Sequence, residues 1–129
     1  MIYNFERDTE SGVVFVTVKL DGGYKLKMVL DTAASSTTVD IMALKIADYP
    51  IDKKIGTAKV ETANGIFDVD VIEVKNLTAL GHTLHNMPIQ IYDFVAHGII
   101  SDYNGLLGID FFENSELCIN LKNNTIEVK

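Results

Sequence analysis

The sequence predicts a mostly β protein with one or two short helices, built as a sandwich or a barrel. Alternation of apolar and polar residues is the commonest pattern, and it first appears in residues 13–20. Turn residues such as Asp21-Gly22-Gly23 and Asn64-Gly65 interrupt the alternating runs at short intervals. Strands this short and frequent are typical of closed or layered β architectures. The 129 residues contain no linker and no low-complexity segment, so we expect a single domain over residues 1–129.

The first half of the chain predicts two hairpins with a helix between them. Residues 13–20 and 24–30 alternate on either side of the Asp-Gly-Gly turn, which predicts the first hairpin. Residues 39–50 change to a helical period and reach Pro50, which predicts a helix of about two turns that the proline stops. Residues 55–74 alternate again around Asn-Gly, the strongest short hairpin signal.

The second half predicts further short strands and a second short helix. Residues 77–94 turn at Gly81 and then alternate, and Pro88 indicates an edge strand or the start of a strand. The sequence GLLGIDFF, residues 105–112, predicts a short helix from Ile109. A strand in LCINL, a turn at two asparagines and a last strand in TIEV end the chain.

Composition excludes several classes of function. The formal net charge is −7 and the isoelectric point is about 4.8, so we expect neither nucleic acid nor an acidic membrane surface as a partner. No apolar run approaches the roughly 20 residues of a membrane span. The start of the chain lacks the pattern of a secretory signal, so we expect a cytoplasmic protein. No glycine-rich phosphate loop is present, and we expect no cofactor.

Histidine and cysteine give weak signals. His82 and His85 are three residues apart, a spacing that also occurs in metal sites, but zinc usually takes three or four ligands with short paired spacings. Solvated histidines are the simpler interpretation, and we expect no metal. Cys118 is a lone cysteine in an apolar run, which favours a small buried residue over a nucleophile.

The most informative stretch is KMVLDTAASSTTVD, residues 27–40. Asp31 follows a strand that the pattern predicts to be buried, and small or hydroxyl residues fill the loop after it. Small residues let backbone approach a ligand closely, and hydroxyls can hold a carboxylate by short hydrogen bonds. The simpler alternative is that Asp31 starts a turn and the hydroxyl residues at 35–38 cap the next helix.

Taken together, three segments resemble the retropepsin-like aspartic peptidases. The stretch VLDTAASSTTV is similar to the active-site loop of that family, with Asp31 as the catalytic aspartate and Thr32, Ala33, Ala34 and Ser35 as the loop. Residues Gly105, Leu106, Leu107 and Gly108 are similar to its second signature, in which a glycine after two apolar residues leads into a short helix. TANG, residues Thr62, Ala63, Asn64 and Gly65, lies where the family has its substrate-binding flap. The resemblance implies a small closed β-barrel in which the Asp loop and the strand before the second motif cross in a ψ-shaped arrangement.

The resemblance also implies a reaction. Peptide hydrolysis by this route uses two carboxylates that share one proton, and the chain has one such aspartate motif. We therefore expect an aspartic endopeptidase that acts on a peptide or protein as a homodimer, with Asp31 contributed twice across the axis. Thr32 matches the threonine that reaches the partner loop. Asp110 lacks the sequence that follows Asp31, and we interpret it as a residue that starts the helix.

Two features of the loop depart from the family or vary within it. Ala33 stands where the family usually has glycine; its N–H toward the aspartate is retained, but its methyl group disfavours a positive φ. Ala34 offers no hydroxyl to the carboxylate, from which we expect activity at mildly acidic to near-neutral pH. The alternative function is a catalytically inactive dimer of the same fold that binds an extended peptide of a partner protein. The substrate, the cleavage preference and the permanence of the dimer stay open.

Overall fold

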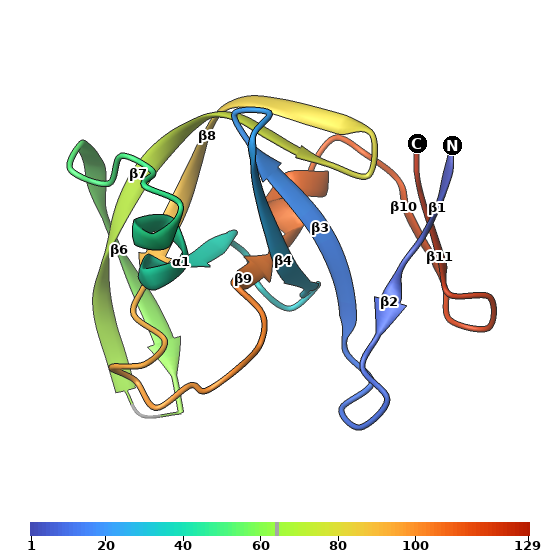
Figure 1. Ribbon diagram of the computed structural model, residues 1–129, viewed down its shortest axis with the longest axis horizontal. Coiled ribbons are helices and arrows are strands. Elements are labelled where there is room, and N and C mark those ends of the chain that lie inside the picture. The colour runs from blue at the N-terminus through green and yellow to red at the C-terminus, as the bar shows by residue number, and fades with distance from the viewer. Residues whose placement is uncertain (64) are drawn as a thin grey trace.

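The computed structural model describes residues 1–63 and 65–129, and these residues form two β-sheets (Figure 1). Within them, the smaller sheet has the strand order β1-β11-β10 and the larger has the order β2-β3-β4-β9-β5-β8-β7-β6. The strands of the smaller sheet are β1 (Ile2–Asn4), β10 (Leu117–Asn120) and β11 (Thr125–Val128). Those of the larger sheet are β2 (Glu6–Arg7), β3 (Val14–Leu20), β4 (Tyr24–Leu30), β5 (Thr38–Asp40), β6 (Lys54–Thr62), β7 (Gly65–Ala79), β8 (His82–Tyr92) and β9 (Gly105–Leu107). The predicted mostly β class is confirmed.

The larger sheet closes into a barrel. The end of β7 pairs with the end of β3, Leu20 opposite Leu77, and this pairing joins β3-β4-β9-β5-β8-β7 into a ring. Both predicted hairpins form, and Asp21 and Gly22 take the positive φ values, 51° and 76°, that a tight hairpin turn demands. β6 lies outside the ring as an edge strand, so the β6–β7 hairpin projects beyond the barrel (Figure 1).

Both predicted short helices form. α1 spans Ile41–Ile46 and η1, a 3-10 helix, spans Ile109–Phe112, as predicted from Ile109. The prediction that Pro50 stops the first helix is wrong, because the chain leaves it at Asp48, whose φ is 55°. The alternative in which hydroxyl residues at 35–38 cap this helix is also wrong, since the side chain of Asp40 caps it at the N–H of Met42. In the part of the chain that is described, no helix is long and apolar enough to cross a membrane.

Strand β7 is longer than predicted. It runs on to Ala79 without a break, because β6 pairs with its first part, β8 pairs with it from Asp70 to Ala79, and β3 pairs with its end on the other side. Pro88 lies inside β8 and not at its start, and β8 is an inner strand of the larger sheet that is an edge only over this part. The registered partners of β8 in β5 begin only at Gln90, so the proline sits where β8 has β7 on one side alone.

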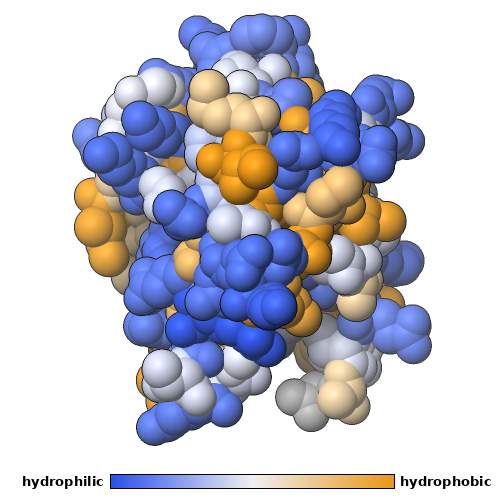
Figure 2. Space-filling model, turned by 90° about the vertical axis from the view of Figure 1, so that its right-hand side faces the viewer, coloured by the Kyte–Doolittle hydropathy of each residue, from blue (hydrophilic) through white to orange (hydrophobic). Residues whose placement is uncertain are grey.

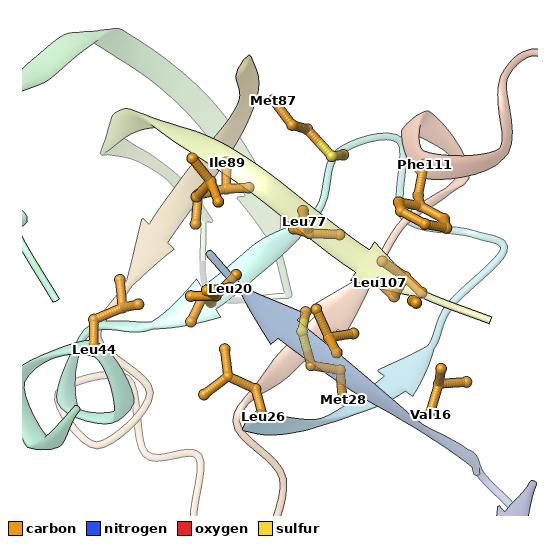
Figure 3. Packing of buried hydrophobic residues seen from close by; sticks show 14 of the residues in the cluster. Val16, Leu20, Leu26, Met28, Leu44, Leu77, Met87, Ile89, Leu107 and Phe111 are labelled. Atoms are coloured by element: carbon orange, nitrogen blue, oxygen red, sulfur yellow. The ribbon is translucent and has the colours of Figure 1, made fainter. Parts of the chain in front are cut away.

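The barrel encloses the main hydrophobic core (Figure 3). Alternate residues of each strand point inward, and Leu20, Met28 and Leu107 are completely buried. Helix α1 adds Leu44, and η1 adds Phe111, so both helices pack against the barrel through apolar side chains. Burial of such side chains contributes about 1.5–3 kcal/mol each, which fixes the strands that carry the loop after β4.

The smaller sheet contains both ends of the described chain. β11 lies between β1 and β10, so this last strand pairs within its own chain. Apolar side chains remain exposed on these strands, with Ile2 64% and Ile119 39% accessible, and on Leu121, which is 52% accessible. Viewed from the side of these terminal strands, the surface is mostly hydrophilic with small hydrophobic groups among the polar ones (Figure 2).

Candidate active site

Asp31 lies directly after β4, where the chain turns away from the barrel. Its backbone N–H donates a hydrogen bond of 3.0 Å to the carbonyl oxygen of Leu107 in β9. Its carboxylate atom Oδ1 accepts a hydrogen bond of 3.0 Å from the backbone N–H of Ala33. The residue is only half-buried. The carboxylate is therefore oriented by its own loop and accessible from outside the barrel.

Alanine fits the loop at position 33. Ala33 is not among the residues with positive φ, so its methyl group causes no backbone strain. The N–H that the sequence analysis expected to point at the aspartate does so. The carbonyl oxygen of Asp31 accepts a bond of 3.1 Å from the N–H of Ala34, whose own carbonyl accepts one of 2.9 Å from Ile109. Thr32, Ala33 and Ser35 are exposed.

A buried hydroxyl fastens this loop to the second motif. The Thr37 side chain donates a hydrogen bond of 2.7 Å to Asp110 Oδ1 and accepts one of 3.1 Å from the N–H of Gly108. The N–H of Thr37 donates a further bond of 2.9 Å to Asp110 Oδ2. Asp110 is thus more than the predicted helix-start residue, since both its oxygens hold the loop after Asp31 through Thr37. Thr37 was missed because a threonine among other hydroxyl residues carries no signal of its partner 73 residues away.

The two glycines of the second motif lie where close packing leaves too little room for a side chain. Residues Gly105 to Leu107 form β9, parallel to β4 and antiparallel to β5, so the motif is inserted beside the Asp loop. A side chain at Gly105 would collide with the carbonyl oxygen of Thr38, and one at Gly108 would come within 2.8 Å of the Ala34 carbonyl oxygen. Leu107 is buried in the core. These contacts form the crossing of the Asp loop and β9 that the resemblance implied.

A pocket of about 580 Å³ lies between the loop and the β6–β7 hairpin. The loop contributes residues 33–36, β5 contributes Thr38, and the hairpin contributes residues 59–62 of β6. The remaining wall is lined by Gln90, Tyr92, Phe94, Ile99, Tyr103 and Leu106. Another cavity, of about 400 Å³, lies near β1, β2 and β3 and contains no residue of the loop.

Aromatic residues that the sequence analysis missed form the far wall of the pocket. The ring of Phe94 contacts those of Tyr92 and Tyr103, each with centroids 6.0 Å apart, and Val60 of the hairpin packs on the same cluster. The His97 ring lies 4.3 Å from Tyr92 and 4.7 Å from Phe67 of β7, and so connects the wall to the hairpin. These residues come from β8 and a segment without regular structure, and no periodicity marks them.

The hairpin residues named from the sequence differ in whether they line the pocket. Thr62 lines the pocket, whereas Ala63 and Gly65 do not. Gly65 has a φ of 127°, which only glycine adopts readily. Asn64 lies outside the described residues. Among nearby apolar residues, Ile99 lines the pocket, and Leu30, Ile66 and Ile100 do not.

His82, His85 and Cys118 do not line the pocket. His82 approaches the carbonyl oxygen of Val128, and His85 pairs with Asn76 at 2.6 Å. Cys118 is half-buried in β10, with Sγ 3.8 Å from Glu116 Oε1. Across residues 1–63 and 65–129, no group of three or more histidine, cysteine or acidic residues is arranged to hold a metal ion.

Comparisons with known proteins agree with this geometry. Residues 16–111 match the family model described as Aspartyl protease. Among solved structures, a retropepsin-like aspartic protease from Rickettsia conorii matches with a TM-score of 0.66 and 16% sequence identity. The match covers 98% of this chain and 87% of that one. A search of curated proteins gave no match. At this identity, the structural match establishes a shared fold.

Proposed function

Because this chain belongs to the aspartyl protease family, we propose that it is an endopeptidase that works as a homodimer and uses Asp31 from each protomer. The observation that carries the proposal is the half-exposed Asp31, whose carboxylate is held by the Ala33 N–H in a loop that lines the pocket with Ala33 and Ala34. Thr32, Ala33, Ala34 and Ser35 form the loop that orients it. No cofactor or metal has a part in this reaction.

The chemistry follows from two carboxylates in hydrogen-bond range. Two like charges so close do not both ionise, so the pair holds one proton. The ionised Asp31 takes a proton from a water, whose oxygen adds to the peptide carbonyl carbon, while the protonated Asp31 donates to the carbonyl oxygen. The C–N bond of the tetrahedral intermediate then breaks as the amine nitrogen takes the proton that the first Asp31 accepted from water, and the second Asp31 takes back its proton from the hydroxyl oxygen, so the pair again holds one proton. Each step moves a proton between groups that touch the reacting atoms.

In this proposal a partner copy is needed because Asp110, the carboxylate that the loop contacts in its own chain, is not available as the second acid. The loop of Asp31 contacts Asp110, but both oxygens of Asp110 are bonded to Thr37, so this carboxylate is not free to share a proton with Asp31. In this proposal the second carboxylate is therefore Asp31 of another copy of the chain. The exposure of Thr32 and Ala33 supports contact with a partner loop. The exposed apolar side chains of the terminal strands would also be covered in such a dimer.

The substrate would bind as an extended peptide. β6 is an edge strand, and its backbone borders the pocket, so a peptide can add to it through main-chain hydrogen bonds. In the proposal, the hairpin with Thr62, Ala63, Asn64 and Gly65 is the flap, and its closure excludes water from the paired carboxylates. Aromatic contacts at Phe67 attach the hairpin to the wall of the pocket.

The test is cleavage of a diverse peptide mixture between pH 3 and pH 8, read by mass spectrometry. Wild type is expected to cut a defined set of bonds, and Asp31→Asn is expected to reduce the rate by about 10³-fold or more, because an amide does not act as the base. Asp48→Asn, which changes an acid outside the site, is the matched control. A transition-state mimic with a tetrahedral hydroxyl should inhibit wild type more strongly than the substrate binds.

One outcome would replace the proposal. If the folded protein cuts no peptide in this pH range but retains specific ones, the catalytically inactive dimer that binds an extended peptide becomes the better account. Cleavage that persists unchanged in Asp31→Asn would reject Asp31 as the catalytic group, whichever peptides are cut.

A further inference from the structure

The floor of the pocket is polar, although its walls are aromatic and aliphatic. Thr38 and Gln90 face each other there across the paired strands β5 and β8. The Thr38 hydroxyl shares its one donor proton between Gln90 Oε1 at 3.2 Å and the Ser36 carbonyl oxygen at 3.3 Å. Along β8, the side chains of Met87, Ile89 and Ile91 enter the barrel core, so Gln90 points to the opposite face, toward the pocket.

Both a donor and an acceptor are left for a ligand at this floor. The Gln90 Oε1 is engaged with Thr38, and its amide nitrogen Nε2 has no hydrogen-bond partner among the described residues. Ser36, which also lines the pocket, uses its backbone carbonyl for Thr38, while its hydroxyl is unpaired within the same residues. The pocket therefore offers N–H groups from Gln90 and an acceptor oxygen from Ser36.

We propose that this pocket selects a substrate side chain that ends in a carboxamide, with Gln90 as the residue that determines the preference. This inference rests on the proposed peptidase function and names the class of peptide it takes. A carboxamide has one acceptor and one donor group, which match Gln90 Nε2 and the Ser36 hydroxyl. Glutamine suits the pocket better than asparagine, because its longer apolar stem can contact Tyr92 and Phe94 in the wall while its carboxamide reaches Gln90.

Other side chains fit the floor less well. A methionine or leucine would cover the Gln90 amide without bonding it, and a buried donor left unpaired is costly. A carboxylate would enter a protein of net charge −7 beside the acidic pair. The charged residues at the rim, Lys59 and Glu61, flank Val60 in β6 and leave the strand on the face opposite to it, and Lys59 pairs there with Asp68 at 2.9 Å. They do not supply an ion-pair partner at the floor.

The experiment measures peptide binding and cleavage separately. The Asp31→Asn variant, which is expected to bind without turnover, is titrated with peptides from a library that differ only by glutamine or methionine at one position. At one position near the scissile bond, glutamine is expected to bind about tenfold more tightly, the factor for roughly one good hydrogen bond. Wild type should show the same ratio in kcat/KM.

Two variants in the Asp31→Asn background assign the effect to Gln90. Gln90→Leu is expected to abolish the glutamine preference while methionine peptides bind at least as well as before. Gln90→Glu replaces the N–H donors by a carboxylate and is expected to shift the preference toward lysine or arginine. Thr83→Val, elsewhere on β8 and away from the pocket, is the matched control and should keep the glutamine preference.

Each outcome decides one of the two proposals. Cleavage without a glutamine preference, or a preference that survives Gln90→Leu, overturns the carboxamide inference and leaves the peptidase intact. A glutamine preference in binding with no cleavage by wild type rejects the peptidase and keeps the pocket assignment. Tight binding of basic or purely aliphatic side chains by the unmodified floor, or no binding of any peptide, rejects the carboxamide inference.

Discussion

Thr37 is the residue that connects the two halves of the candidate site. It is completely buried, and its hydroxyl is both a donor to Asp110 and an acceptor for Gly108. Its neighbours Ser35 and Ser36 are more accessible and line the pocket instead. Within this run of hydroxyl residues, the Thr37 side chain is therefore buried and binds the second motif, whereas Ser35 and Ser36 lie on the side of the pocket.

Substitution of Thr37 by the isosteric valine tests this connection. We expect Thr37→Val to lower the free energy of unfolding by about 1–3 kcal/mol, because the Gly108 N–H and one Asp110 oxygen lose their partner in a buried place. Urea unfolding at neutral pH measures the change. Thr78→Val, which removes an exposed hydroxyl pair with Thr83, is the control and should cost less than about 0.5 kcal/mol. An equal loss in both variants would contradict the role assigned to Thr37.

At the scale of elements, Asp21 and Tyr49 join three parts of the chain that the sequence leaves far apart. Asp21 lies in the turn between β3 and β4, and its carboxylate accepts bonds from the Asn76 N–H of β7 at 3.0 Å and from the Tyr49 hydroxyl at 2.9 Å. Tyr49 follows α1 and is buried against the barrel core. Burial, and then the hydrogen bond and charge of Asp21, raise the pKa of Tyr49 to about 12.

This raised pKa predicts a loss of stability in alkali. The unfolded chain loses the tyrosine proton near pH 10, whereas the folded protein keeps it up to about pH 12. The contribution is therefore complete below pH 10 and disappears as the pH rises through 12, since ionisation then favours the unfolded state. We expect Tyr49→Phe to be less stable than wild type by about 1 kcal/mol at pH 7 and the gap to narrow above pH 10.

Urea unfolding of both proteins from pH 7 to pH 11 gives this gap directly. Tyr24→Phe is the control, because it removes the exposed hydroxyl of the ring that contacts Tyr49 edge-on at 5.6 Å. A gap between wild type and Tyr49→Phe that is constant over the whole range would show that ionisation of Tyr49 has no part in alkaline unfolding.

The sequence predicts elements better than it predicts their partners. Alternation and turn residues predicted the first two hairpins, and the two apolar residues and the glycine before Ile109 predicted η1, because these signals are local. The early end of α1 at Asp48 and the length of β7 were not predictable, since they depend on contacts with Leu44 and with β3. In the site, Asp31 and its loop follow from a motif, while Gln90 and Tyr103 reach the pocket only through the fold.

At the scale of the whole molecule, the proposed function makes one protomer half of a hydrolytic site. The barrel holds one Asp31 at its surface, and the exposed residues of its loop face outward. Exposed apolar side chains also remain on the terminal strands, among them Ile2 and Leu121. If the site is completed by a second copy, activity has to depend on how protomers are paired rather than on the amount of intact Asp31 alone.

Mixing wild type with Asp31→Asn tests this dependence. After exchange of protomers at low concentration, a hybrid dimer holds one carboxylate and is expected to be inactive, because the second acid is missing. Activity per wild-type chain should then fall in proportion to the wild-type fraction, to about a tenth at a ninefold excess of the variant. The measurement is the initial rate on one cleaved peptide at fixed wild-type concentration, with sedimentation to establish that dimers are present. Asp48→Asn in the same excess should leave the rate unchanged. A rate that stays constant as Asp31→Asn is added would mean that a single chain carries the complete catalytic site.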